Sequence, residues 1–476
     1  MKSDKLLPQL GLFTTITIVV GAVIGSGIFK KPAVMAADLG SPELLLVIWI
    51  LAGVLTLFGA LSNAEVAGLI PETGGQYIFF EKMYGSLTAY LYGWAILSVI
   101  QTGSIASITY VFAEYTQYFF TLPRLSPELE NSFYLYMPFI GKIFPLKDIG
   151  VKSLTIIVIL LLTTVNYFGI KYGGRVAEFF TSAKVIAIIL LVAAGFLYGG
   201  GTMSNLSFDT PDFSYGELGM IGGIVAALSA AFWSFDGWNN VTYIAGEVKN
   251  PMRNIPKALI IGTVIIIAVY MLINVAYLYV LPIDVMAGSK LVASDVADKA
   301  IGAWGGGMIA ALVMVSTFGT SNGTIMVSAR VYYAMSNRGM FFRVFGNTNA
   351  KHHTPANALA LQAVWSCGLV LSGSFDDLTD MLIFVSWIFY ALGAYGVIVL
   401  RKKMPEAQRI YKVPFYPYIP LIFVFVASIF VILTLYNDIY NYIDGKSDII
   451  NSLFGILLVL MGLPLYYYFN KKKDKK

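Results

Sequence analysis

The sequence is short of the residues on which many other classes of protein depend. It has one cysteine, Cys367, which excludes an intrachain disulfide and a CxxC metal site, and it has two histidines. Charged residues make up 12% of the 476 residues, about half of their share in ordinary globular proteins. A soluble enzyme, a nucleic-acid-binding protein and a disordered scaffold are therefore excluded as descriptions of the whole chain, and no motif predicts a metal or another cofactor.

Apolar residues are abundant instead and make up 57% of the sequence. A transmembrane helix needs about 20 apolar residues, and twelve stretches meet this condition. The alternating ten-residue segments of membrane β-barrels do not occur. The predicted fold is thus an all-α membrane protein with 12 transmembrane helices. The predicted spans are 11–37, 42–68, 85–120, 149–168, 176–200, 218–246, 254–281, 303–337, 355–373, 375–400, 415–437 and 448–469.

Most of the Lys and Arg residues fall on one side of these spans. With the N-terminus inside, they gather in cytoplasmic segments such as 401–412 and in the tail 471–476, whereas an outer segment such as 376–380 is acidic. The positive-inside rule then predicts a multi-pass protein of the cell membrane with both termini cytoplasmic. The basic tail is expected to contact anionic membrane lipid. The longest connection, 121–148, is too short for a soluble domain, so residues 1–476 are predicted to form one transmembrane domain.

Two of the predicted helices are interrupted near mid-membrane. The first is broken by Gly25–Phe29, which Lys30-Lys31-Pro32 follow, and the sixth by Ser234–Asn240. Each interruption lies in the opening part of a block of five spans, about 11–200 and about 218–401, and two extra helices follow at about 415–470. An odd number of spans inverts the second block, and glycine-interrupted helices in inverted halves are typical of transporter binding sites. The glycines are equally compatible with close helix packing.

An interrupted helix can bind both ends of an amino acid zwitterion. Free backbone amides at the start of the second half of the first helix, with the Ser26 hydroxyl, suit a carboxylate. Free carbonyl groups at the ends of the first halves of both helices suit an ammonium group. The residues predicted in this way to bind substrate are Val23, Ile24, Gly25, Ser26, Gly27, Ile28, Trp233, Ser234, Asp236 and Gly237.

Several motifs together resemble the amino acid, polyamine and organocation (APC) superfamily, and within it the L-type amino acid transporter family. The motifs are Gly21-Ala-Val-Ile-Gly-Ser-Gly-Ile-Phe29 with Pro32, Pro71-Glu-Thr-Gly-Gly-Gln-Tyr77, Trp94 to Gly103, Phe235-Asp-Gly-Trp-Asn239 with Glu247-x-Lys-Asn-Pro251, and Ser328-Ala-Arg330. The resemblance covers nearly the whole chain and implies a five-plus-five inverted repeat, alternating access, and substrate bound at the broken first and sixth helices. Similar animal proteins are disulfide-linked to a heavy chain. Because Cys367 lies mid-membrane, no disulfide-linked heavy chain is expected here.

Lys184 is a cation in the middle of the fifth span, where it costs on the order of 2.5 to 3.5 kcal/mol. Its sequence position is equally compatible with a functional role and with a side chain that snorkels to the membrane surface. The resemblance implies the functional role, because a lysine at this place is thought to stand where related symporters bind sodium, next to the first break and the eighth helix. Transport would then be sodium-independent. The resemblance also implies that Tyr270 and Asn322 support this lysine, although each could instead form only a helix-helix hydrogen bond.

Asp236 and Trp233 belong to the second interruption. Asp236 suits an N-cap of the second half of the sixth helix, and we favour this interpretation over proton carriage. A bulky aromatic residue at the place of Trp233 resembles the family's gate over bound substrate, although an ordinary core or lipid-facing aromatic residue fits as well.

These observations predict a secondary transporter, not an enzyme, that moves neutral L-amino acids by sodium-independent exchange or facilitated transport. Three alternatives stay open. One is a proton-coupled symporter in which Asp236 or Lys184 titrates. The second is a transporter of amines or polyamines, and the third is an amino acid sensor that binds its ligand without transport.

Overall fold

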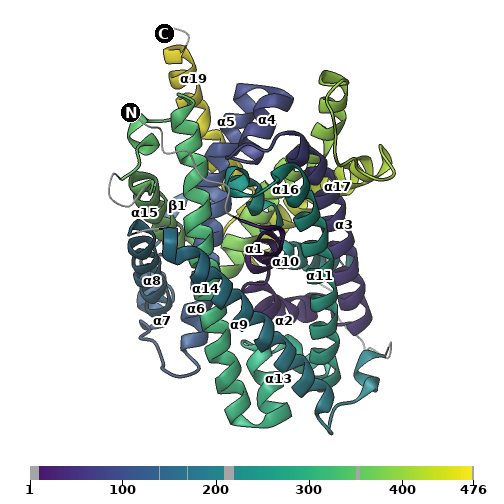
Figure 1. Ribbon diagram of the computed structural model, residues 1–476. Coiled ribbons are helices and arrows are strands. Elements are labelled where there is room, and N and C mark those ends of the chain that lie inside the picture. The colour runs from purple at the N-terminus through teal and green to yellow at the C-terminus, as the bar shows by residue number, and fades with distance from the viewer. Residues whose placement is uncertain (1–9, 139, 169, 208–218, 350–353, 474–476) are drawn as a thin grey trace.

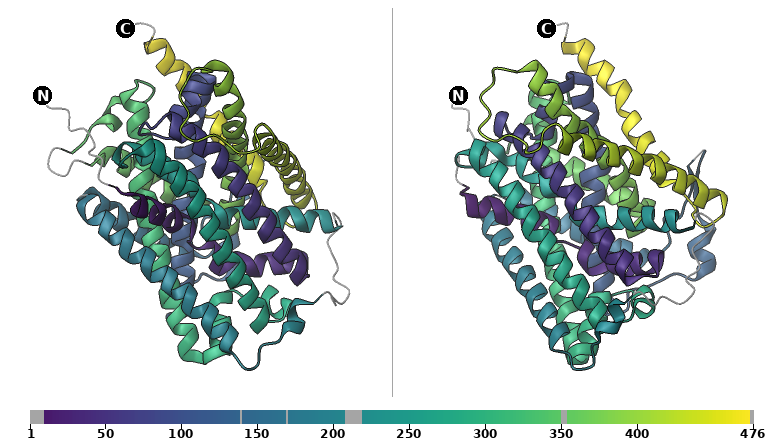
Figure 2. Two further views of the ribbon diagram at one scale, coloured as in Figure 1. Left: turned by 45° about the vertical axis from the view of Figure 1, so that its right-hand side comes forward. Right: turned by 90° about the vertical axis from the view of Figure 1, so that its right-hand side faces the viewer.

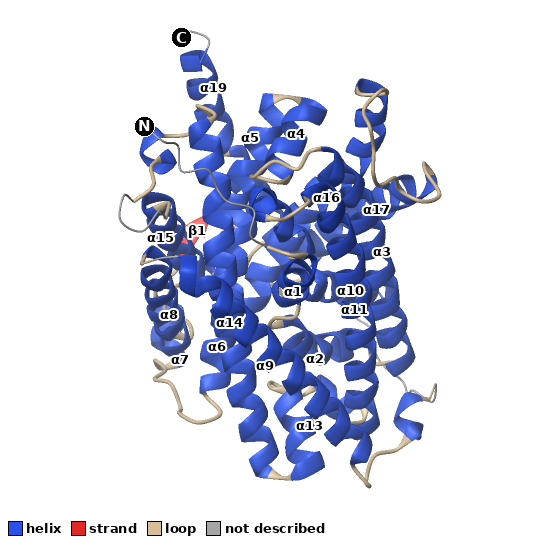
Figure 3. Cartoon of the chain, viewed as in Figure 1, coloured by secondary structure: helices blue, strands red, loops and turns tan. Residues whose placement is uncertain are grey.

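A computed structural model of the chain describes residues 10–138, 140–168, 170–207, 219–349 and 354–473 (Figure 1). Helices dominate these ranges, which also contain one short antiparallel hairpin (Figure 3). The longer helices are α1 Leu12–Val23, α2 Gly27–Leu39, α3 Pro42–Leu69, α5 Ser86–Ala95, α6 Gln101–Thr116, α8 Ile149–Tyr167, α9 Ile170–Leu197, α10 Gly219–Phe235, α11 Pro251–Val280, α14 Ala303–Asn337, α15 Ala356–Ser372, α16 Phe375–Lys403, α17 Tyr418–Ile443, α18 Asn451–Leu460 and α19 Gly462–Lys473. The shorter elements are α4 Gln76–Tyr84, η1 Ile96–Ile100, α7 Pro127–Ser132, β1 Leu135–Met137, β2 Gly141–Ile143, η2 Met203–Leu206, η3 Trp238–Glu247, α12 Ile283–Ala287, α13 Val292–Ile301 and η4 Arg343–Gly346.

The helices agree with the predicted spans. Within the described residues, 11 helical segments are long and apolar enough to cross a membrane. They match eleven of the predicted spans, with ends that differ by a few residues, and α15, which has 17 residues, matches the remaining one. The chain is therefore an all-α, multi-pass membrane protein. The inverted relation between the two blocks of five spans stays a prediction, and the last three residues of the basic tail lie outside the described ranges.

Local signals in the sequence determine where several helices begin. The Ser41 side chain accepts a hydrogen bond from the Leu44 amide, so it caps α3 at the point where Pro42 begins the helix. At α16, Ser374 and Asp377 form a reciprocal capping box. These caps separate α3 from α2 and α16 from α15, because a capped start gives the free amides of a new helix their partners.

Both predicted interruptions are present. Residues 24–26 separate α1 from α2, and Asp236 and Gly237 separate α10 from the 3₁₀ helix η3. The first break is shorter than the predicted Gly25–Phe29, because α2 already begins at Gly27 and includes Phe29 as well as Pro32. Pro32 is compatible with a helix this close to its start, since the carbonyl that it would displace lies near the break.

The connection between α6 and α8 contains structure that the sequence analysis did not predict. It holds α7 and the hairpin of β1 and β2, in which Leu135 pairs with Ile143. The Arg124 guanidinium donates two hydrogen bonds, of 2.9 and 3.1 Å, to the Glu130 carboxylate. These bonds hold the pKa of Glu130 below its usual value. A π-helical turn, η1, also interrupts the third span without any signal recognised in the sequence.

The two ends of the helical bundle differ in what they contain. Helices α4 and α19 lie at one end and α13 lies at the other in all three views (Figures 1 and 2). The first described residue, Leu10, pairs with the end of η3: its amide donates to Glu247 O over 2.9 Å, and its carbonyl accepts from Lys249 N over 2.8 Å. The start of the described chain is therefore fixed to the segment that follows the second break.

Glu65 on α3 is a buried carboxylate that connects α16 and the segment after it to α3. Its side chain is 2% exposed and accepts two hydrogen bonds from the Arg401 guanidinium, of 2.9 and 2.7 Å. It also accepts a bond of 2.8 Å from the Val413 amide, and Arg409 Nε lies 3.2 Å away. A single acidic side chain thus orders the turn between α16 and α17.

We expect Glu65→Ala to lower the free energy of unfolding by about 3 kcal/mol, because it leaves Arg409 and a backbone amide without their buried acceptor. This loss is at the lower end of the range of about 3 to 5 kcal/mol for breaking a buried ion pair, because the Arg401 side chain is 24% exposed. Thermal unfolding of the detergent-solubilised protein measures it. Glu406→Ala in the same turn, at an exposed position, is the control, and equal melting temperatures for the two variants would contradict the prediction.

Candidate substrate site

The first break presents backbone groups and one hydroxyl group to the interior. Helix α1 ends at Val23 and α2 starts at Gly27, so the first amides of α2 have no partner within their own helix. Ser26 is 1% exposed, and its Oγ has no hydrogen-bond partner in the described chain. A helix N-terminus with a free hydroxyl group beside it is suited to an anion.

The second break depends on a glycine. Gly237 has φ +97°, a left-handed conformation that residues with a Cβ atom rarely adopt. The predicted N-cap role of Asp236 is wrong, because Gly237 itself is the N-cap of η3 and no side chain caps that end. The Asp236 carboxylate instead accepts a hydrogen bond of 2.6 Å from the Tyr390 hydroxyl on α16. Nothing in the sequence around Tyr390 indicated this contact.

The two breaks lie against each other. A Cβ atom placed on Gly27 would be 2.6 Å from both the Cα and the Oγ of Ser234, so only glycine permits this approach. The glycine therefore does serve close packing, and the packing joins the two breaks. Gly25 and Gly237 line a common cavity with Ser26, Gly27 and residues of α6 and α14.

That cavity holds about 20 Å³, roughly the space of one water molecule. Trp233 lines it, is 5% exposed and packs edge-on against Phe375 at a centroid distance of 6.0 Å. The Trp233 indole N–H, like the Ser26 hydroxyl, has no partner in the described chain. Two buried polar groups thus face a cavity whose walls come from both breaks, and the cavity must widen before it can hold an amino acid.

Lys184 binds the end of α1. Its ammonium group donates to Gly21 O, Ile24 O and Thr320 Oγ1, each over 2.7 Å, and the residue is 2% exposed. The side chain therefore does not snorkel to a membrane surface but joins α9, the first break and α14. Three oxygen acceptors use all three N–H donors of the ammonium group.

Tyr270 and Asn322 were expected to support Lys184, but neither donates to or accepts from its ammonium group. The Tyr270 hydroxyl lies 3.0 Å from Val23 O and 2.9 Å from Ser234 O, so it bridges the ends of the two first half-helices. Asn322 Oδ1 instead accepts a hydrogen bond of 2.7 Å from Asn166. The third partner of the lysine is Thr320, which lies two positions before Asn322 in the same polar segment.

The four carbonyl groups predicted to bind an ammonium group all have protein donors. Val23 O and Ser234 O share the single proton of the Tyr270 hydroxyl, Ile24 O accepts from Lys184, and Trp233 O accepts from the Asp236 amide over 3.0 Å. Each carbonyl oxygen has a second lone pair and can accept one further bond. Substrate binding at these oxygens would therefore add to the existing bonds or displace the Tyr270 hydroxyl.

We expect Tyr270→Phe to change the apparent substrate affinity by about fivefold, because it removes one hydroxyl that is shared between the two breaks. Concentration dependence of uptake measures the effect. Tyr277→Phe is the matched control: this buried tyrosine on the same helix has a longer bond, of 3.4 Å, to Ile28 O. Unchanged affinity in Tyr270→Phe would show that its bridge plays no part in substrate binding.

Comparison with known proteins assigns the chain to a family. The model of the family described as "Amino acid permease" matches residues 10–462. The chain belongs to the amino acid permease family. Because this family lies within the APC superfamily, the resemblance inferred from the motifs is confirmed.

Individual permeases are similar over nearly the full length. The b(0,+)-type amino acid transporter 1 of Homo sapiens is 32% identical over 473 residues, which cover 98% of this chain and 89% of that protein. The serine/threonine exchanger SteT of Bacillus subtilis is 30% identical and covers 99% of both chains. The large neutral amino acids transporter small subunit 2 of Mus musculus is 28% identical over 469 residues, which cover 96% of this chain and 80% of that protein. The chain is thus an amino acid transporter and not an enzyme.

Ion pairs tie the segments next to both breaks to neighbouring helices. Arg330 on α14 pairs with Glu247 at the end of η3 over 3.0 Å. Lys30 pairs with Glu114 over 2.5 Å and Lys31 with Asp376 over 2.7 Å, so two adjacent lysines tie α2 to α6 and α16. The elements on which the breaks lie are therefore anchored to α6, α14 and α16, and these contacts must rearrange if either break moves.

Proposed function

We propose that this permease exchanges neutral L-amino acids across the cell membrane without sodium. One observation carries the proposal: the Lys184 ammonium group is bound by two carbonyl oxygens at the first break and by Thr320 Oγ1. A lysine ammonium group at this place supplies the positive charge that a bound driving ion would otherwise provide. The substrate then moves under its own gradient or in exchange for another amino acid.

The substrate carboxylate binds at the N-terminus of α2 in this proposal. The free amides of Ser26, Gly27 and Ile28 and the unpartnered Ser26 hydroxyl support this placement, since they are donors without an acceptor. The ammonium group binds at the second lone pairs of the carbonyl oxygens of Val23, Ile24, Trp233 and Ser234. An amine without a carboxylate would leave the donors at α2 unused, which disfavours the amine alternative.

Selectivity for neutral side chains is supported by the cavity and by the names of two of the relatives. Among the residues that line the cavity, Asp236 is the one with an ionisable side chain, and its carboxylate already accepts from Tyr390. The names of two relatives refer to serine and threonine and to large neutral amino acids, and the first is described as an exchanger.

The small size of the cavity and the ion pairs around it support alternating access. We infer that α2 and α10 move away from α6 and α16 to admit substrate from one side, and that α1 and η3 move away from α14 to release it on the other. Trp233 covers the substrate on the side of Phe375. Tyr270, which bonds to both breaks, and Lys184, which bonds to the first, couple these movements.

The orientation in the membrane belongs to the same proposal. We propose that α4 and α19 lie at the cytoplasmic end, where basic residues such as Arg338 and Lys403 gather, and that both termini are cytoplasmic in the cell membrane. Cys367 lies within α15 and is half-buried, a position that does not suit a disulfide to a heavy chain outside the membrane.

Competition for uptake tests the substrate class. Proteoliposomes loaded with unlabelled neutral L-amino acids should take up a labelled mixture of them in sodium-free buffer. Alanine should compete, whereas its methyl ester and propionate should not, because each lacks one charged group of the zwitterion. Equal competition by simple amines would favour an amine transporter. Ligand binding without any flux would favour a sensor.

Proton coupling is the second candidate, because Asp236 lines the cavity. It predicts that an inward proton gradient drives uptake into liposomes without internal amino acid. Asp236→Asn keeps an acceptor for Tyr390 and removes the titrating group. Loss of gradient-driven uptake with unchanged exchange would support the symporter.

A further inference from the structure

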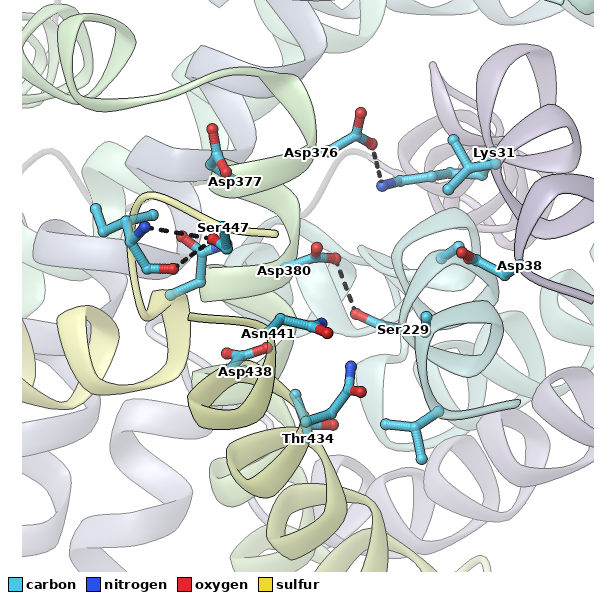
Figure 4. Close-up of a pocket in the computed structure, with 17 residues that line it drawn as sticks. Lys31, Asp38, Ser229, Asp376, Asp377, Asp380, Thr434, Asp438, Asn441 and Ser447 are labelled. Atoms are coloured by element: carbon cyan, nitrogen blue, oxygen red, sulfur yellow. Dashed lines mark hydrogen bonds and ion pairs between the residues drawn. The ribbon is translucent and has the colours of Figure 1, made fainter. Parts of the chain in front are cut away.

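A second, larger cavity lies beside α10, nearer the N-terminal end of that helix than Trp233 of the substrate site. It holds about 220 Å³ and is lined by residues of α2, α10, α16, α17 and the segment that leads into α18. Figure 4 shows carboxylates from three of these helices around it, with Asp380 of α16 in the middle of the group. The amino acid permease assignment gives this cavity no role.

The cavity has more acidic groups than its own cation can neutralise. The Lys31 ammonium group donates hydrogen bonds to Asp376 Oδ1 over 2.7 Å and to Thr379 Oγ1 over 2.9 Å. Asp377 belongs to the capping box of α16. The carboxylates of Asp38, Asp380 and Asp438 form no direct ion pair among the described residues, and Lys31 acts on the first two only at longer range. Their hydrogen bonds come from neutral groups: Ser229 Oγ donates to Asp380 over 3.0 Å, and the Ser452 amide donates to Asp438 over 2.9 Å.

Two buried polar groups in the same wall also have no partner. Thr434 is 4% exposed and Asn451 is 9% exposed, and both line the cavity. Neither Thr434 Oγ1 nor Asn451 Oδ1 has a hydrogen-bond partner in the described chain. A buried polar group without a partner is costly, so these two acceptors indicate a donor that comes from outside the chain. Thr434 lies one helical turn before Asp438 on α17, which places both on one face of the helix (Figure 4).

We propose that this cavity binds a small organic cation through an ammonium or guanidinium group. Such a group has three or five N–H donors and no acceptor, which matches a wall of carboxylate, hydroxyl and amide oxygens. The volume is below that of a drug-sized site and suits a short aliphatic amine. A chelated metal ion fits less well, because the described residues contain no group of three acidic, histidine or cysteine side chains placed to hold one.

The position of the cavity gives the bound cation an effect on transport. Asp38 lies on α2 and Ser229 on α10, the helices that carry the two breaks, whereas Asp380 and Asp438 lie on α16 and α17. A cation held between these pairs favours the arrangement in which α2 and α10 are packed against α16. Because a ligand shifts an equilibrium toward the state that it binds better, occupancy should lower the maximal rate of exchange and leave the apparent KM for a neutral amino acid unchanged.

Thermal unfolding of the full-length protein with 1,5-diaminopentane or n-butylguanidine is the first test. Neither compound has a carboxylate, so neither can use the amides of α2. Both should raise the melting temperature, whereas tetramethylammonium, which has the same charge and no N–H donor, should not. Asp380→Asn should weaken the apparent affinity for both compounds about tenfold, since it removes one charged acceptor and keeps an oxygen for the Ser229 hydroxyl. Asp444→Asn, in the exposed turn after α17, is the matched control.

A comparison of lysine with 1,5-diaminopentane shows whether the natural ligand is a free amino acid or a free amine. If a free amino acid is the natural ligand, lysine should stabilise the wild-type protein more than 1,5-diaminopentane does, and Asp380→Asn should remove that advantage. If a free amine is the ligand, the two compounds should act equally. Stabilisation by neutral amino acids should survive in Asp380→Asn, so a failure of this proposal can be told apart from a failure of the proposed function.

Three results would overturn the proposal. The first is equal stabilisation by tetramethylammonium, which would show a general effect of charge. The second is equal affinity for 1,5-diaminopentane in wild type, Asp380→Asn and the second variant Asp38→Asn. The third is inhibition of neutral amino acid exchange that raises KM alone, which would place the amine in the substrate site.

Discussion

Lys184→Ala is expected to lower the rate of amino acid exchange about 100-fold. The substitution removes three charge-assisted hydrogen bonds and leaves the carbonyl groups of Gly21 and Ile24 and the Thr320 hydroxyl without the ammonium donor. A loss of about 3 kcal/mol in the stability of the closed arrangement is modest for three such bonds, and it corresponds to a factor of about 100. Initial rates of exchange in sodium-free proteoliposomes measure it.

The effect of Lys184→Ala should differ between the two faces of the membrane. The lysine fixes the end of α1, which in our proposal moves during opening on one side only. The apparent substrate affinity should therefore weaken more on that side, measured by varying external or internal amino acid separately. Lys152→Ala is the control, because Lys152 is also a buried lysine and bonds to Phe144 O, far from the breaks in the chain. Equal and unchanged affinities on both faces would contradict the role given to Lys184.

Gly27→Ala is expected to abolish exchange, with a rate at least about 100-fold below that of the wild type. The added Cβ would lie 2.6 Å from Ser234 Cα, a backbone atom that cannot move without the rest of the helix. The two breaks must then separate, and separation removes the shared wall of the cavity and the Tyr270 bridge between Val23 O and Ser234 O. Overpacking of this kind costs about 1 to 3 kcal/mol even where neighbours can adjust.

Gly323→Ala is the matched control for Gly27→Ala. Gly323 lies in α14 close to Thr320, but a Cβ at this position would meet no atom within 4 Å. Replacement of a glycine inside a helix by alanine is favourable by roughly 1 kcal/mol, so this variant should exchange amino acids at the wild-type rate. Exchange by Gly27→Ala at half of the wild-type rate or more would show that the contact between the breaks is dispensable.

The spans of the fold could be predicted from the sequence because each depends on length and composition. Apolar residues must fill about 30 Å of bilayer, so α3 or α11 is visible without any knowledge of its neighbours. The hairpin of β1 and β2 could not be predicted in the same way, since its three-residue strands are too short for a periodic signal. The π-helical turn η1 was also missed, because its residues are as apolar as the rest of the span.

The candidate site was predictable where a residue is unusual in its surroundings. Lys184 is conspicuous in an apolar run, and Gly25 and Gly237 mark the breaks. The partners of these residues were not predictable, because they come from distant parts of the chain: Lys184 bonds to backbone oxygens about 160 positions away and Tyr390 reaches Asp236 across 154 positions. Every residue has a backbone carbonyl group, so the residue type does not show which carbonyl oxygen a buried lysine will bind. Asp236 shows the same limit, since a plausible local cap gave way to a tertiary partner.

The central claim is that the paired breaks and Lys184 support exchange of neutral L-amino acids without a driving ion. Uptake of a labelled neutral amino acid mixture into proteoliposomes in sodium-free buffer, with and without unlabelled amino acids inside, tests it most directly. The account predicts rapid uptake into loaded liposomes and little into empty ones, unchanged when sodium is added. Equal uptake into empty liposomes that rises with an inward proton gradient would contradict it and assign the coupling to a titrating group such as Asp236.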